Sequence, residues 1–174
     1  MRMRWQPSLQ IVPHYESEPL YIKALKKSVL KKLKEIKWKP DTIIASYHGI
    51  PKKYFDKGDP YHCYCHKTTR LLVESLKINI PIMTTFQSRF GPEEWLQPYT
   101  DETLESLPAL GKKKILVICP GFASDCVETL EEIAIQGKET FVDAGGENFD
   151  LIPCLNDNKD HISLFKHLVQ QTLK

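Results

Sequence analysis

The distribution of hydrophobic positions predicts a chain in which strands and helices alternate. Short apolar runs rich in β-branched residues predict strands at 8–12, 42–47, 81–87 and 114–119, with a weaker one at 149–152. Apolar residues spaced three or four positions apart predict helices over 20–37, 60–76, 101–110, 125–139 and 160–173. Because each connection between strands is long enough to hold a helix, we expect a parallel sheet with helices on both faces.

Two of these helices carry specific signals. Ile22, Leu25 and Val29 begin an apolar stripe that continues to residue 36, and lysines occupy the opposite face. Asp59 and Pro60 are typical of a helix start, so the next helix is expected to run from there to about residue 76.

The amino-acid composition is that of an ordinary globular protein and points to no special class of protein. The chain has 174 residues, 41% hydrophobic and 26% charged, with a net charge of +2. This is one domain of ordinary soluble character, with no strong field that would favour nucleic acid. No apolar run reaches 18 residues, and the first residues, "MRMRWQPS", lack the apolar core of a signal peptide. Five cysteines, an odd number, fit free thiols in a reducing compartment, so we expect a cytoplasmic protein.

Polar residues follow three of the predicted strands at the point where each strand ends. The stretches are "SYHGIP" at 46–51, "FQSRFGP" at 86–92 and "CPGFASDCVE" at 119–128. Parallel strands bring their carboxyl ends to one edge of the sheet, where ligands bind in α/β proteins. The side chains expected to converge there are His48, Gln87, Ser88, Arg89, Asp125 and Glu128. The apolar walls expected around them are Phe86, Phe90, Trp95 and Phe122.

His48 and Glu128 are the candidate pair for chemistry at this edge. An imidazole facing a carboxylate is a plausible site for a divalent cation such as Fe²⁺ or Zn²⁺. Glu132 lies four residues after Glu128 on the same helical face, whereas Glu131 and Glu139 are expected to lie on a solvated face. Taken alone, a histidine at a strand end is equally consistent with a structural role.

The same stretches resemble a known family. "SYHGIPKKYFDKGDPY", "TFQSRFGPEEWLQPYTDETL" and "ILVICPGFASDCVETLEEI" look like three signature stretches of the carboxyl-terminal half of ferrochelatase, in order, and the resemblance runs from about Trp5 to the end. Ferrochelatase inserts Fe²⁺ into protoporphyrin IX to form protoheme. The resemblance implies one Rossmann-like lobe over residues 1–174, with a four-stranded parallel sheet, and it implies that the amino-terminal lobe is missing.

The resemblance also implies roles for individual residues. His48 and Glu128 match the pair that ligates iron or removes the pyrrole protons, and which of them does which stays open. Ser88 and Trp95 match residues on the porphyrin-facing side, and Glu132 is a candidate for a path of protons or metal to solvent. Fe²⁺ is a substrate here, and no resident cofactor is expected.

The sequence departs from the family pattern at two positions. Cys126 stands where many members carry histidine, and Gln136 replaces a common acidic residue on the same helix. These departures put in doubt a role for that histidine and for the outer part of the metal path.

The stretch "HCYCH" at 62–66 has the residue types of a metal centre. Cys63 and Cys65, two positions apart on a helix, would point about 200° apart, so we predict no iron–sulfur cluster. His62 and His66 lie four apart, on what we expect to be a solvated helix face.

Two other functions stay open from the sequence. One is a non-catalytic half-domain that holds porphyrin or metal. The other is a cobalt or nickel chelatase for a different tetrapyrrole, although such enzymes usually carry a second histidine in place of Glu128. The basic amphipathic helix over 20–37 also allows peripheral contact with a membrane, against the simpler interpretation of a solvated helix.

Overall fold

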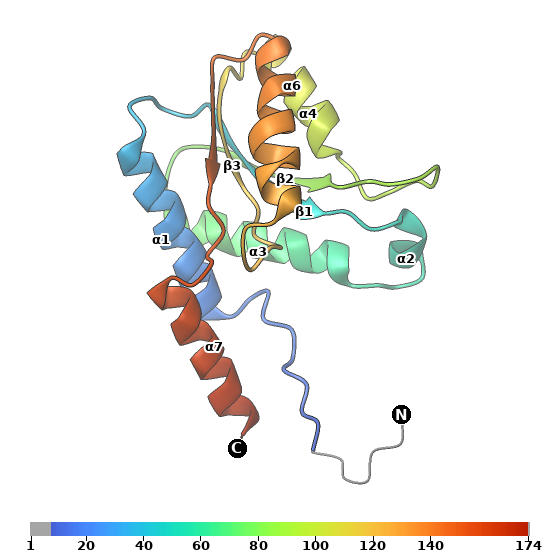
Figure 1. Ribbon diagram of the computed structural model, residues 1–174, viewed down its shortest axis with the longest axis vertical. Coiled ribbons are helices and arrows are strands. Elements are labelled where there is room, and N and C mark those ends of the chain that lie inside the picture. The colour runs from blue at the N-terminus through green and yellow to red at the C-terminus, as the bar shows by residue number, and fades with distance from the viewer. Residues whose placement is uncertain (1–7, 174) are drawn as a thin grey trace.

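The computed structural model describes residues 8–173, and Figure 1 shows the arrangement of its elements. The strands are β1 (Thr42–His48), β2 (Ile82–Gln87), β3 (Lys114–Ile118) and β4 (Asn148–Ile152). The helices are α1 (Pro19–Glu35), α2 (Lys52–Asp56), α3 (Tyr61–Leu76), α4 (Thr100–Ser106), α5 (Val127–Leu130), α6 (Lys138–Asp143) and α7 (Lys159–Thr172). A 3₁₀ turn, η1 (Pro108–Leu110), follows α4, and a π-helix, η2 (Glu132–Gly137), joins α5 to α6.

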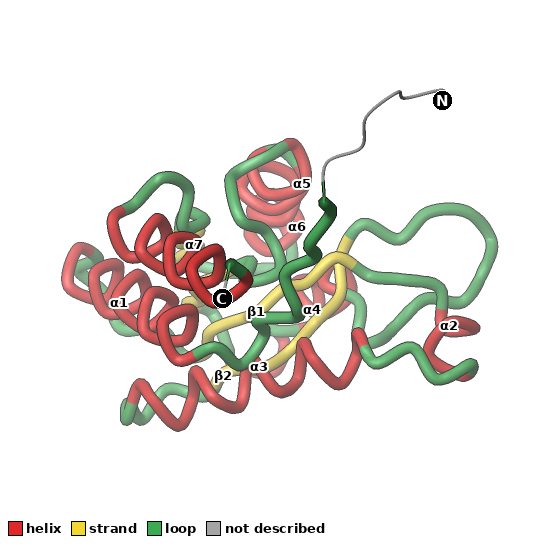
Figure 2. The backbone as a smooth tube through the Cα atoms, turned by 90° about the horizontal axis from the view of Figure 1, so that it is seen from below, coloured by secondary structure: helices red, strands yellow, loops and turns green. Residues whose placement is uncertain are grey.

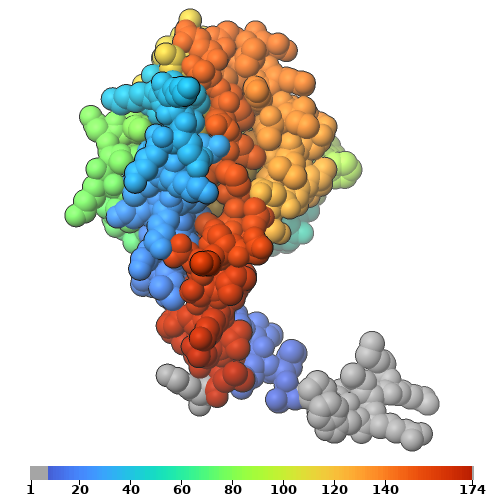
Figure 3. Space-filling model, turned by 60° about the vertical axis from the view of Figure 1, so that its left-hand side comes forward, coloured from blue at the N-terminus to red at the C-terminus, as the bar shows by residue number. Residues whose placement is uncertain are grey.

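The four strands form one parallel sheet in the order β2-β1-β3-β4. Helices cover both faces of the sheet: α1, α3 and α7 lie on one side, and α4 and α6 on the other (Figures 1 and 2). On the outer surface, α1 and α7 lie side by side (Figure 3). This arrangement confirms the predicted α/β fold.

Alternation along the strands divides the core into two layers. Ile43, Ala45 and Tyr47 of β1 point into the layer shared with α1, α3 and α7. Ile44 points to the opposite layer, where it meets residues of α4, η2 and α6 such as Leu104. A strand buried on both faces reads as a continuous apolar run, which explains why β1 was recognisable from sequence.

The predicted stripe of α1 and the start of α3 are also confirmed. Ile22, Leu25 and Val29 are buried against the first layer. The Asp59 carboxylate accepts a hydrogen bond from the Tyr61 amide, at 2.9 Å, where α3 begins.

Two predictions about elements were wrong, and one short helix was missed. Residues 8–12 form no strand, and the side chains of Leu9 and Ile11 are more than four-fifths exposed, so the run buries nothing against the sheet. The helix predicted over 125–139 is divided among α5, η2 and α6, and α2 was not predicted at all. The prediction that the first residues lack the apolar core of a signal peptide concerns mainly residues 1–7, which lie outside the described part of the chain.

Candidate active site at the carboxyl edge of the sheet

His48 is the last residue of β1, at the edge where the carboxyl ends of the strands meet. Its ring lies near two aromatic side chains, with centroids 6.4 Å from Trp95 and 6.3 Å from Phe122. The ring nitrogen Nδ1 is 2.7 Å from the carbonyl oxygen of Gly49. If Nδ1 carries the proton and donates it to that oxygen, Nε2 is free as an acceptor or ligand.

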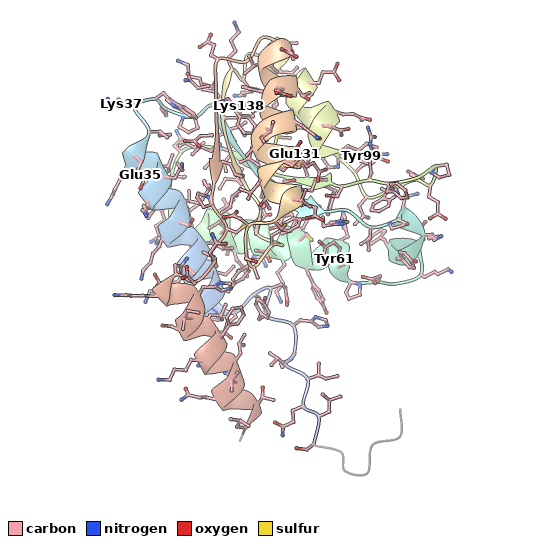
Figure 4. The ribbon with its side chains drawn as sticks, viewed as in Figure 1. Glu35, Lys37, Tyr61, Tyr99, Glu131 and Lys138 are labelled. Carbon is pink, nitrogen blue, oxygen red and sulfur yellow. The ribbon has the colours of Figure 1, made fainter. Side chains whose placement is uncertain are left out.

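Two neighbours fix the backbone around His48. The Tyr61 hydroxyl donates to the His48 carbonyl oxygen at 2.8 Å, and Figure 4 shows Tyr61 at the start of α3. A Cβ on Gly49 would lie 3.0 Å from the Gln87 carbonyl oxygen and 3.1 Å from the Trp95 ring. A side chain at position 49 would therefore require the Gln87 carbonyl or the Trp95 ring to move by a few tenths of an ångström.

Glu128 lies in the first turn of α5, where the amino end of a helix favours negative charge. The Cys126 thiol, the Glu128 backbone amide and the nearby His48 together hold the pKa of Glu128 below its usual value. The carboxylate is thus an anion at neutral pH. The Glu128 backbone carbonyl accepts a hydrogen bond at 2.7 Å from Gln87, the register partner of His48, so His48 and Glu128 lie at the same edge of the sheet.

Ser88 and Glu132 form a second group beside this pair. The Glu132 carboxylate accepts hydrogen bonds from the Ser88 amide and the Ser88 hydroxyl, both at 2.6 Å. Ser88 has a positive φ of 63°, a conformation that is uncommon for a residue with a side chain. Glu132 therefore stabilises the turn that follows β2.

A cavity of about 230 Å³ lies next to Ser88 and Glu132 and is lined largely by polar side chains from α4 and η2. Glu131 instead lies on the exposed side of the helical run with Lys138 (Figure 4), and Glu139 is exposed as well. These positions agree with the expected solvated face for Glu131 and Glu139.

Two polar residues expected at the edge are engaged in contacts with other protein groups. Arg89 pairs with Asp101 and Glu102 at 2.8 Å each, and its guanidinium lies 4.2 Å from the centre of the Tyr99 ring. The Asp125 carboxylate is hydrogen-bonded to the loop after β4.

The expected apolar walls are only partly present. Phe86 is 1% exposed and stacks on His62 at 5.6 Å, because its position in β2 directs it to the α3 layer. Phe90 is 85% exposed, whereas Trp95 and Phe122 flank His48. The Trp95 indole donates to the Phe90 carbonyl oxygen at 3.0 Å, which secures the loop that carries both.

Asp125 connects two loops at this edge. Its carboxylate accepts hydrogen bonds from the Asn156 side chain at 2.7 Å and from the Cys154 amide at 3.0 Å. In return, the Asn156 side-chain oxygen accepts from the Asp125 amide at 2.8 Å. No sequence signal marked Asn156, because the contact spans 31 residues.

The "HCYCH" stretch lies in the first turns of α3. Cys63 is exposed, whereas Cys65 is buried, and burial raises the pKa of its thiol to about 12. The rings of His62 and His66 lie 4.4 Å apart. Among residues 8–173, no group of three or more His, Cys, Asp or Glu side chains is arranged to hold a metal ion.

Fold and site define a class: a Rossmann-like α/β lobe with a histidine and a carboxylate placed at the ligand-binding edge of a parallel sheet. Comparison with known proteins gives the family. The ferrochelatase family model matches residues 1–173. The chain belongs to the ferrochelatase family.

Similar proteins include ferrochelatases of Rhizobium meliloti (strain 1021), with 55% identity over 177 residues, and of Allorhizobium ampelinum, with 55% over 175. A ferrochelatase of Brucella anthropi is 51% identical over 175 residues. Each match covers 100% of this chain but only 52%, 51% and 50% of the relative, respectively. The chain therefore spans about half the length of the curated relatives it matches.

Proposed function

We propose that this chain supplies the metal-side half of a ferrochelatase, a lyase that inserts Fe²⁺ into protoporphyrin IX to form protoheme. One observation supports the proposal: the segment that carries Glu128 is bonded through its backbone to Gln87, the register partner of His48, so the two residues that resemble the family's metal site share one edge of the sheet. Membership of the ferrochelatase family across the whole chain supports the same function.

Metal insertion sets three physical requirements. A free porphyrin carries two N–H protons in a flat ring, so the ring must be distorted, the protons accepted and the metal partly stripped of water. The imidazole of His48 has an unshared nitrogen available as a proton acceptor or metal ligand. Glu128 supplies the opposing negative charge that an entering Fe²⁺ or a transferred proton needs.

Neighbouring residues have supporting parts in the proposal. Trp95 and Phe122 flank the imidazole and offer apolar contact to a flat macrocycle. We assign Ser88 to the porphyrin-facing side and Glu132 to a path for protons or metal. The tight bonds between these two also give Glu132 a structural task, so its substitution should affect folding as well as activity.

We further propose a cytoplasmic location. Among residues 8–173, no helix is long and apolar enough to cross a membrane. The apolar stripe of α1 is buried in the core, so any membrane contact through this basic helix would be electrostatic.

The proposal is tested with His48→Ala in a complete enzyme, made by joining this chain to the amino-terminal half of the Rhizobium meliloti relative. Metal insertion is followed by the loss of porphyrin fluorescence. We expect activity to fall by about 100-fold or more, because the acceptor is lost, while far-UV circular dichroism stays unchanged. His167→Ala, on α7 beside Glu18, is the matched control. Activity of His48→Ala within a few-fold of the unsubstituted enzyme would contradict the proposal.

A further inference from the structure

Gln87 is a buried polar residue at the centre of the candidate site. It ends β2 and is the register partner of His48 in β1. Only 3% of the residue is exposed. A buried amide must have its hydrogen bonds satisfied inside the protein, so its partners reveal what it holds together.

The amide of Gln87 connects three strands to the helix that carries Glu128. Its oxygen accepts a hydrogen bond from the Ser46 hydroxyl of β1 at 2.8 Å and lies 3.6 Å from the Cys119 sulfur after β3. Its nitrogen donates to the Glu128 backbone carbonyl at 2.7 Å and to the Glu132 carboxylate at 3.1 Å. Because a carbonyl and a carboxylate only accept, the nitrogen has to face the helix.

The contact falls where the helical hydrogen bonding changes. In α5 the Glu131 amide donates to the Val127 carbonyl, four residues back, whereas in η2 the Gln136 amide donates to the Glu131 carbonyl, five residues back. Backbone groups at such a change of spacing depend on donors from outside the regular ladder. Gln87 supplies one to Glu128, and the amide and hydroxyl of Ser88 hold Glu132 next to it.

We propose that Gln87 is a positioning residue, which sets the place of Glu128 relative to His48 by bonding the junction of α5 and η2 to the strand ends. The importance of the His48–Glu128 pair rests on the proposed function. The hydrogen bonds of Gln87 do not depend on it. Since β1 and β2 are paired at His48 and Gln87, the sheet that carries the imidazole also holds the helix that carries the carboxylate.

The test uses Gln87→Met, which keeps the length of the side chain and removes its hydrogen bonds. Gln136→Met is the matched control, because Gln136 is exposed and its side chain donates a hydrogen bond to the Glu131 carboxylate on the same helical run. Hydrogen exchange of the 174-residue chain, read by mass spectrometry, is expected to speed up by about tenfold or more over 127–137 in Gln87→Met. Amides of β1 and β3 should keep the exchange rates of the unsubstituted chain, and Gln136→Met should change neither region.

A second measurement reports on the pair itself. Co²⁺ is titrated into the same chain, and its visible absorption spectrum gives both affinity and coordination geometry. We expect Gln87→Met to weaken Co²⁺ binding by about fivefold or more and to alter the spectrum, because Glu128 is no longer held in place. Gln136→Met should match the unsubstituted chain, and His48→Ala should lose the binding.

A second variant, Gln87→Glu, guards against a failure of Gln87→Met to fold. It keeps the shape but places a carboxylate beside that of Glu132, so it should also open the segment over 127–137 at pH 7. Exchange over 127–137 equal to that of the unsubstituted chain would overturn the inference, as would exchange raised uniformly through the sheet. Local opening, with no Co²⁺ binding by any form of the chain, would uphold the inference and count against the proposed function.

Discussion

The Glu128 carboxylate differs from the other acidic groups of its helical run in what surrounds it. The Cys126 thiol, its own backbone amide and His48 favour its charged form, whereas the Glu139 side chain is exposed on α6. Both residues are glutamates separated by 11 positions in the sequence. A carboxylate at the same sheet edge as an imidazole can act together with it on a metal ion or a proton, whereas a solvated carboxylate on α6 cannot.

Replacing Glu128 and Glu139 in turn by glutamine distinguishes a chemical role from a solvated one, because glutamine keeps the shape of the side chain and removes its charge. In the joined full-length enzyme, we expect Glu128→Gln to reduce metal insertion by about 100-fold or more, and Glu139→Gln by less than about twofold. Rates are measured by the loss of porphyrin fluorescence at saturating porphyrin. Equal losses in the two variants would mean that the acidic band is only a solvated face.

Single residues of the site could be predicted from sequence where their position in a strand or turn decides their direction. His48 and Glu128 follow from the end of one strand and the first turn of one helix. Arg89 does not, because its acidic partners Asp101 and Glu102 lie on α4, outside the local pattern. Phe86 was assigned to the site although the alternation of β2 directs it to the α3 layer.

At the scale of elements, Asp125 holds the loop before α5 against the loop after β4. Partial burial would raise its pKa, but hydrogen bonds from Asn156 and Cys154 outweigh that effect and hold the pKa below its usual value. A carboxyl whose pKa is lower in the folded chain stabilises it fully above the unfolded-state pKa, about 4. That contribution is lost as the pH falls through the folded-state value.

Asp125→Asn should therefore lower the free energy of unfolding by about 1–2 kcal/mol at pH 7, where the charged hydrogen bonds are fully formed. The difference from the unsubstituted chain should shrink as the pH is lowered from about 5 to about 2. Urea unfolding followed by circular dichroism at several pH values measures both effects. Asp143→Asn, at an exposed position of α6, should change stability by less than about 0.5 kcal/mol. A constant difference across the pH range would contradict the assigned cause.

Regular elements were the most predictable part of the fold. The strands β1, β2 and β3 are short buried runs, and α1, α3 and α7 each bury one apolar stripe, so local pattern decides them. The π-helix η2 was not predictable, because the bonds at its start come from Gln87 in another element. Residues 8–12 show the opposite error, an apolar run without a sheet edge to join.

At the scale of the whole molecule, the candidate site is open on one side. His48, Trp95 and Phe122 lie at the edge of a single sheet, and Phe90 is 85% exposed beside them. The curated relatives are about twice as long as the matched segment. A flat macrocycle resting on this edge would have protein on one face and water on the other.

We therefore predict that the 174-residue chain folds alone but does not insert metal at enzymatic rates. Its two buried core layers are sufficient for a domain of this size. Distortion of a porphyrin needs contacts on both faces, and the fields of His48 and Glu128 are strong only where water is excluded. Circular dichroism with thermal melting should show a cooperative transition, while porphyrin fluorescence should decay no faster with the chain than with His48→Ala.

Adding the amino-terminal half of the Rhizobium meliloti relative as a separate chain should restore insertion if the halves associate. Rapid insertion by the chain alone would refute the need for a second side, and a non-cooperative melt would refute its autonomous folding.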